Sequence, residues 1–88
     1  MNKFARIIGT GSYLPPNVVT NDDLSKTIDT TDEWITTRTG IKQRHVVSDE
    51  STCDLAHKAS IQALEMAGID VSELDLIILA TTTPDKIF

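Results

Sequence analysis

The chain has 88 residues and a formal net charge of −5, with 40% hydrophobic and 24% charged residues. This is the composition of an ordinary soluble globular protein, and a chain of this length can bury one modest core. The acidic balance argues against general nucleic-acid binding, which requires a basic surface. No apolar run approaches the ~20 residues of a membrane span, and the run after Arg6 stops at Gly9, too short for a signal peptide.

The first element in chain order is a predicted strand over Phe4–Leu14, rich in β-branched residues at its centre and closed by two prolines. Gly9 and Gly11 match the start of the dinucleotide-binding pattern G-x-G-x-x-G. Leu14 stands where the third glycine is needed, however, and the prolines follow where the phosphate-binding helix should begin. We therefore interpret the two glycines as permitting a bend or a close backbone approach within a strand.

Two short helices are predicted next, after a loop over Asn17–Asn21. Thr20 or Asn21 can cap the first helix, over Asp22–Ile28, because its early carboxylates lie near the positive end of the helix dipole. The second helix carries Trp34. It can begin after a cap at Thr30 or Thr31, and Gly40 ends it.

A partly exposed strand over Ile41–Val47 follows, and then the longest predicted helix, Thr52–Ala67. Ser51 and Asp54 resemble a capping box at its start, and Gly68 stops it. The helix has many small residues on its inward side, which predicts close packing against a sheet.

The apolar stretch Leu74–Thr81 is predicted to be a central strand, buried on both faces, of an α/β sheet. Such a strand needs cover on both sides, and this chain offers one substantial helix. We therefore expect residues 1–88 to be the front part of a larger α/β domain, without an internal domain boundary.

Few residues suggest chemistry by their spacing alone. Cys53 is the only cysteine, which excludes an internal disulfide and fits a reducing cytoplasm. Cys53 and His57 are one helical turn apart, so either they form a Cys–His pair or they are a small helix residue and a solvated histidine. No cysteine or histidine cluster has metal-ligand spacing, so no metal site is predicted.

Trp34 and Arg38 are the main candidates for a binding site. At i and i+4 of a helix they project from the same face, where the ring can stack on a purine while the guanidinium pairs with phosphate. The alternative is a half-buried core tryptophan that Arg38 covers. Arg38, Lys42 and Arg44 also fall in a stretch without acidic residues, which indicates either a local anion site or a solvated strand face.

Several segments together resemble the N-terminus of β-ketoacyl-acyl-carrier-protein synthase III, in order and through essentially the whole chain. The segment around Trp34 is the most specific of them. The matching segments are residues 7–15 (IIGTGSYLP), 29–41 (DTTDEWITTRTGI), 44–45 (RH), 65–68 (EMAG) and 75–82 (DLIILATT).

This resemblance implies a thiolase-like fold of two similar halves, usually a homodimer in the cytoplasm, of which this chain would open the first half. The family transfers an acyl group, commonly acetyl, from acyl-coenzyme A to malonyl-acyl-carrier protein with release of carbon dioxide, which starts a fatty-acid chain. Acyl-coenzyme A is a substrate, and no separate cofactor is expected. The family's catalytic cysteine, histidine and asparagine lie beyond Phe88, so Cys53 is not the nucleophile and this chain holds no catalytic residue.

By the same resemblance, the chain contributes to coenzyme A binding. Trp34 would stack on the adenine, Arg38 would stack or pair near the adenine and phosphate end, and Thr30 would line the nucleotide site. The other expected partners are malonyl-acyl-carrier protein and the remainder of the domain, with no nucleic acid and no membrane. Two alternatives remain: a related acyltransferase of secondary metabolism, and a non-catalytic truncated fragment.

Overall fold

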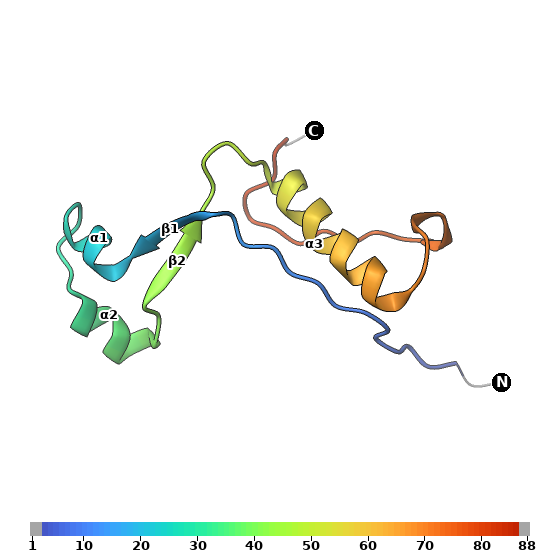
Figure 1. Cartoon of the computed structure of the whole chain (residues 1–88), viewed down its shortest axis with the longest axis horizontal. Helices are drawn as coiled ribbons and strands as arrows, with labels where there is room; N and C mark the ends of the chain where they lie inside the picture. The colour runs from blue at the N-terminus through green and yellow to red at the C-terminus, as the bar shows by residue number, and fades with distance from the viewer. Residues whose placement is uncertain (1–2, 87–88) are drawn as a thin grey trace. The chain divides into compact units, whose positions relative to one another are not determined.

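The computed structural model describes residues 3–86 (Figure 1). Two compact units make up the chain: Leu14–Asp49 forms one, and the residues up to Tyr13 together with those from Glu50 onwards form the other. The elements, in chain order, are β1 (Asn17–Thr20), α1 (Asn21–Ser25), α2 (Asp32–Thr39), β2 (Gln43–Val46), α3 (Thr52–Ala67) and the 3-10 turn η1 (Val71–Glu73).

In the unit Leu14–Asp49, β1 and β2 pair antiparallel, with Asn17 opposite Val46 and Thr20 opposite Gln43. The expectation of a loop over Asn17–Asn21 is therefore wrong, since its first four residues form a strand. Val18, Val19 and Thr20 are β-branched and suit a strand, but only the pairing with β2, more than 20 residues later, makes them one. The strand predicted over Ile41–Val47 is confirmed in its central part.

Side-chain caps fix the two short helices of this unit. Thr20 and Asp23 form a capping box at the start of α1, with the Asp23 amide 3.1 Å from the Thr20 hydroxyl oxygen. The helix ends at Ser25 and not at Ile28, because the Leu24 carbonyl accepts bonds from the amides of both Thr27 and Ile28 and closes a turn there.

Helix α2 has the predicted ends. The Thr31 hydroxyl accepts a hydrogen bond from the Trp34 amide at 3.1 Å, so Thr31 and not Thr30 is the cap. Gly40 ends the helix at a φ of +73°, which L side chains rarely adopt. Capping residues close to the helix in the sequence thus determine both ends of α2.

In the other unit, α3 also has the predicted bounds. Ser51 and Asp54 form the capping box, with 3.1 Å between the Asp54 amide and the Ser51 hydroxyl, and Gly68 supplies the left-handed end. Residues 3–13 run beside this helix (Figure 1). They are tied to it where the Ser12 amide donates to Gln62 at 3.0 Å and the Thr10 amide contacts the Met66 sulfur at 3.3 Å.

The strand predicted over Phe4–Leu14 is not formed, because residues 3–13 lie against α3 and have no ladder partner among the described residues. The expected close backbone approach does occur. A Cβ added at Gly9 would lie 2.9 Å from the Ala67 amide nitrogen, and one added at Gly11 would lie 2.6 Å from that of Ala63. The glycine-containing segment therefore packs against the small residues of α3, where the sequence predicts a sheet.

The strand predicted over Leu74–Thr81 is likewise not formed in the described chain. A strand is defined by hydrogen bonds to a neighbour, and no described segment pairs with this one. Its side chains are exposed, 75% for Leu76 and 83% for Ile78, and no hydrophobic side chain is buried anywhere in residues 3–86. The expected modest core is therefore absent from the part of the chain that the structure describes.

Candidate functional site

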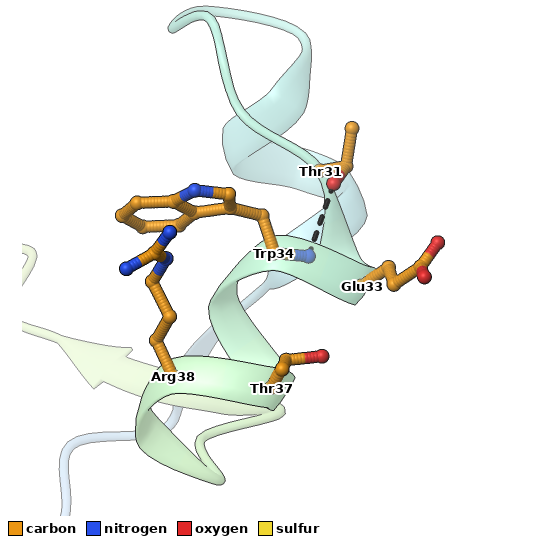
Figure 2. Close-up of a pocket in the computed structure, with 5 residues that line it drawn as sticks. All are labelled: Thr31, Glu33, Trp34, Thr37 and Arg38. Atoms are coloured by element: carbon orange, nitrogen blue, oxygen red, sulfur yellow. Dashed lines mark hydrogen bonds between the residues drawn. The ribbon is translucent and has the colours of Figure 1, made fainter.

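Helix α2 presents Trp34 and Arg38 on one face, as their spacing predicts. The guanidinium carbon of Arg38 lies 4.6 Å from the centre of the Trp34 ring, within the range of a cation–π contact. Figure 2 shows the guanidinium lying against the indole, while Glu33 and Thr37 point away from it. Trp34 is 54% exposed among the described residues, so the side chain is partly covered and partly accessible, which agrees with either alternative.

Two hollows adjoin Trp34, and this side chain lines both. One has a volume of about 470 Å³ and includes Arg38, and the other has a volume of about 450 Å³ and includes Thr30. Their full linings are Thr31, Glu33, Trp34, Thr37 and Arg38 for the first, drawn in Figure 2, and Ile28, Asp29, Thr30, Thr31 and Trp34 for the second. The indole thus borders both hollows, and its exposed part is accessible to a flat ligand ring.

Thr30 lies in the segment that enters α2, where its amide donates to the Ile28 carbonyl at 3.0 Å. Its hydroxyl oxygen is buried and has no hydrogen-bond partner among the described residues. Thr30 lines the hollow, but its hydroxyl oxygen is covered by neighbouring residues of the chain. The three residues expected in the site therefore lie on α2 and in the turn before it, with Thr30 before the helix, Trp34 in its first turn and Arg38 in its last.

Sequence reasoning missed the residue that holds α2 in place. Asn21 is 1% exposed, and its amide nitrogen donates to Asp32 at 2.8 Å and to the Ile41 carbonyl at 2.7 Å, with Thr36 at 3.3 Å. The only sequence signal was an asparagine in a position suited to capping α1. Its contacts are 11 to 20 residues away, so no local pattern predicts them.

The group Arg38, Lys42 and Arg44 does not form one anion site. Arg44 turns toward its own unit, where its two terminal nitrogens donate to Asn21 Oδ1 at 2.6 Å and to the Val19 carbonyl at 3.1 Å. The alternative of a solvated strand face is also wrong for Arg44, which is half-buried. Arg38 remains as the cation beside the tryptophan.

The Cys53–His57 alternative gains no support. Both side chains are exposed on α3, and no hydrogen bond joins them in the described range. The start of α3 binds a carboxylate instead: Asp85 accepts from the amides of Thr52 at 2.7 Å and Cys53 at 2.8 Å. These backbone bonds, that from Cys53 first, lower the pKa of Asp85 below its ordinary 3.8.

Three further observations concern His45, metal binding and membrane-spanning helices. His45 on β2 has its Nδ1 2.6 Å from the Pro15 carbonyl, which engages that nitrogen in the fold. Within residues 3–86, no group of three or more His, Cys, Asp and Glu side chains could hold a metal ion. No helix in the same range is long and apolar enough to cross a membrane.

Comparison with known proteins gives strong matches along the whole chain, although no family model matches it. The β-ketoacyl-[acyl-carrier-protein] synthase III of Vesicomyosocius okutanii is 78% identical over 88 residues, which are 100% of this chain and 28% of that protein. The crystal structure of 3-oxoacyl-[acyl-carrier-protein] synthase III from Aquifex aeolicus superposes with a TM-score of 0.89 at 58% identity. The match covers 93% of this chain and 27% of the Aquifex aeolicus chain.

A third match is the crystal structure of the priming β-ketosynthase from the R1128 polyketide biosynthetic pathway. It is 41% identical, with a TM-score of 0.77, and covers 90% of this chain and 25% of that one. The fold thus matches a piece of a thiolase-like fold. More narrowly, the chain matches the N-terminal part of β-ketoacyl-acyl-carrier-protein synthase III, and it spans about a quarter of the length of these relatives.

Proposed function

We propose that this chain is the N-terminal part of an acyltransferase that condenses acyl-coenzyme A, commonly acetyl-coenzyme A, with malonyl-acyl-carrier protein to start fatty acids. Within that enzyme, this segment contributes to coenzyme A binding and carries no catalytic residue. The enzyme works as a cytoplasmic homodimer and needs no cofactor besides its acyl-coenzyme A substrate. The match along the whole chain to proteins named β-ketoacyl- or 3-oxoacyl-[acyl-carrier-protein] synthase III supports this activity.

One observation carries the binding role: an exposed indole that borders two hollows and has a cation 4.6 Å from its centre. Adenine offers a flat π face for Trp34, and base–aromatic stacking is worth about 1–3 kcal/mol per base. Arg38 presents a planar fork of donors that matches phosphate oxygens. Thr30 lines one of the two hollows beside the same ring.

A second candidate function is the priming of a polyketide chain by the same kind of acyl transfer. The match to the priming β-ketosynthase, at 41% identity, favours it as the alternative. Coenzyme A recognition through Trp34 is compatible with both, so the distinction lies in the acyl group and the carrier protein. Condensation assays that compare acetyl-coenzyme A with longer acyl-coenzyme A donors separate the two.

The binding role is tested by titration calorimetry of coenzyme A with the full-length enzyme that carries this chain. Replacing Trp34 with alanine is expected to weaken binding by about 1–3 kcal/mol, while Trp34→Phe retains a stacking face and loses less. Glu65→Gln, a change at an exposed position of α3 in the other unit, serves as the control. Equal affinities for Trp34→Ala and the unmodified enzyme would contradict the assignment.

A further inference from the structure

The contacts of Asn21 span the whole length of α2. Asp32 is the first residue of the helix, Thr36 lies in its middle, and Ile41 follows the glycine that ends it. The Asn21 side chain donates to Asp32 at 2.8 Å and to the Ile41 carbonyl at 2.7 Å. One buried amide is therefore bound to both ends of the helix that carries Trp34 and Arg38.

Asn21 holds α2 from the side opposite the site. Asp32 and Thr36 are one turn apart, and each is two residues, about 200° around the helix, from Trp34 and Arg38 respectively. The Thr36 hydroxyl also donates to Asp32 at 3.2 Å, so this rear face is polar and interconnected. A rotation of the helix that moved the rear face away from Asn21 would therefore also turn the stacked pair.

The other end of the Asn21 side chain is equally engaged. Its oxygen accepts from Arg44 at 2.6 Å, and Arg44 also donates to the Val19 carbonyl, so the link reaches β1 and β2. The backbone amide of Asn21 donates to the Lys42 carbonyl at 3.1 Å. The paired strands are thus joined to the helix through one residue whose polar groups are all bound.

We infer that Asn21 is a positioning residue for coenzyme A binding, an inference that rests on the proposed function. It does not touch the ligand. It fixes the orientation of α2, and hence of Trp34 and Arg38, by donating to Asp32 and Ile41 while accepting from Arg44. Aspartate in its place has nearly the same size and keeps the acceptor for Arg44, but it has no N–H to donate and faces the carboxylate of Asp32.

The test uses the full-length enzyme and four variants: Asn21→Asp, the double variant Asn21→Asp with Asp32→Asn, Trp34→Ala, and Ser51→Ala as a destabilising control in the other unit. Each is measured for kcat, for the KM of acyl-coenzyme A and of malonyl-acyl-carrier protein, and for the midpoint of thermal unfolding. The double variant moves the amide to the other partner, so the hydrogen bond between positions 21 and 32 can form in reverse.

Asn21→Asp is expected to raise the KM for acyl-coenzyme A about 5- to 30-fold and to change that for malonyl-acyl-carrier protein less than about twofold. The double variant should recover the part of that loss that comes from the contact with Asp32, but not the part that comes from the Ile41 carbonyl, which has no donor in either variant. Ser51→Ala should lower the unfolding midpoint without changing either KM. A merely structural role moves the midpoint and the amount of active enzyme, and does not raise one KM selectively.

The inference is overturned if Asn21→Asp resembles Ser51→Ala, or if the double variant recovers nothing. It is also overturned if neither Asn21 variant folds, because Asn21 would then be a requirement of the fold itself. If Trp34→Ala raises the KM for acyl-coenzyme A and Asn21→Asp does not, only this inference is lost. If Trp34→Ala changes nothing, the proposed binding function is wrong.

Discussion

Arg38 lies 4.6 Å from the centre of the Trp34 ring, one helical turn along α2. The helix backbone sets the spacing of the pair, and the ring limits the rotamers of the arginine. This restriction reduces the side-chain entropy that binding a ligand would cost. The indole therefore orients the cation.

We expect Arg38→Ala to weaken coenzyme A binding by about 1–3 kcal/mol through the loss of charge-assisted hydrogen bonds. Arg38→Lys should restore only part of this, since lysine keeps the charge but lacks the planar group that lies against the indole. Calorimetry at two salt concentrations checks both variants. The salt dependence should diminish for alanine and persist for lysine, and a lysine variant with full affinity would contradict a stacking role.

The segment containing Gly11 should not tolerate a side chain. A Cβ there would meet the Ala63 amide at 2.6 Å and the Gln62 Cβ at 2.8 Å, both on α3. Gly11→Ala is therefore expected to lower the free energy of unfolding by about 1–3 kcal/mol, because the segment or the helix must shift. Urea unfolding of the full-length enzyme measures this change.

Gly40 provides a matched comparison, because it has open space around it and a φ of +73°. Gly40→Ala should cost about 1–2 kcal/mol through backbone strain alone. Gly40→Asn should cost less, since asparagine tolerates the left-handed conformation. At position 11 every side chain is expected to destabilise the fold. A Gly11→Ala variant with an unchanged free energy of unfolding would contradict the close packing of this segment on α3.

The contact of Asp85 with the start of α3 should depend on pH. Hydrogen bonds from the Cys53 and Thr52 amides lower the pKa of Asp85, so the folded chain favours the carboxylate. The stabilisation is then fully present above the ordinary value of 3.8 and is lost as the pH falls through the lowered value. Hydrogen exchange of the Thr52 and Cys53 amides, compared between pH 6 and the acid range, should show this loss.

Asp85→Asn is the control for that experiment. It keeps one acceptor oxygen but not the charge, so protection of both amides should fall at pH 6 and vary less with acid. Unchanged protection in this variant would mean that other groups cap the helix. Ser51 and Asp54 form a second acid-sensitive contact at the same helix end, and the pKa of Asp54 is lowered mainly by the Ser51 amide.

The exposed segment Leu74–Thr81 should respond differently in two settings. Ile78 is 83% exposed here, so Ile78→Lys in a polypeptide of residues 1–88 should cost little and should reduce the binding of a hydrophobic dye. In the full-length enzyme, where we expect this segment to be an internal strand, the same change should cost about 2–5 kcal/mol. A full-length variant with unchanged stability would contradict the expectation of a buried strand.

Sequence predicted those features that local chemistry determines. Ser51, Gly40 and Gly68 mark helix ends correctly, because a cap depends only on residues within one turn. The spacing of Trp34 and Arg38 predicted their contact for the same reason. These signals were sufficient to place the candidate site on α2.

Features that depend on distant partners were not predictable in this way. The sequence predicts a loop where β1 forms, because the strand that pairs with it, β2, comes two helices later in the chain. Leu74–Thr81 has the composition of a strand but no described neighbour to pair with. Asn21 looked like a capping residue, and only the tertiary fold reveals that it binds α2 at both ends.

The pairing of Asn17 with Val46 has one more consequence. The stretch between them includes α1, α2 and the stacked pair. Its two ends lie opposite each other, about 5 Å apart as in any antiparallel ladder. A segment with such closely spaced ends can be grafted into a related protein without altering the distance that its host must bridge. If the proposed function is right, such a graft exchanges the coenzyme A site while the host keeps its own catalytic residues.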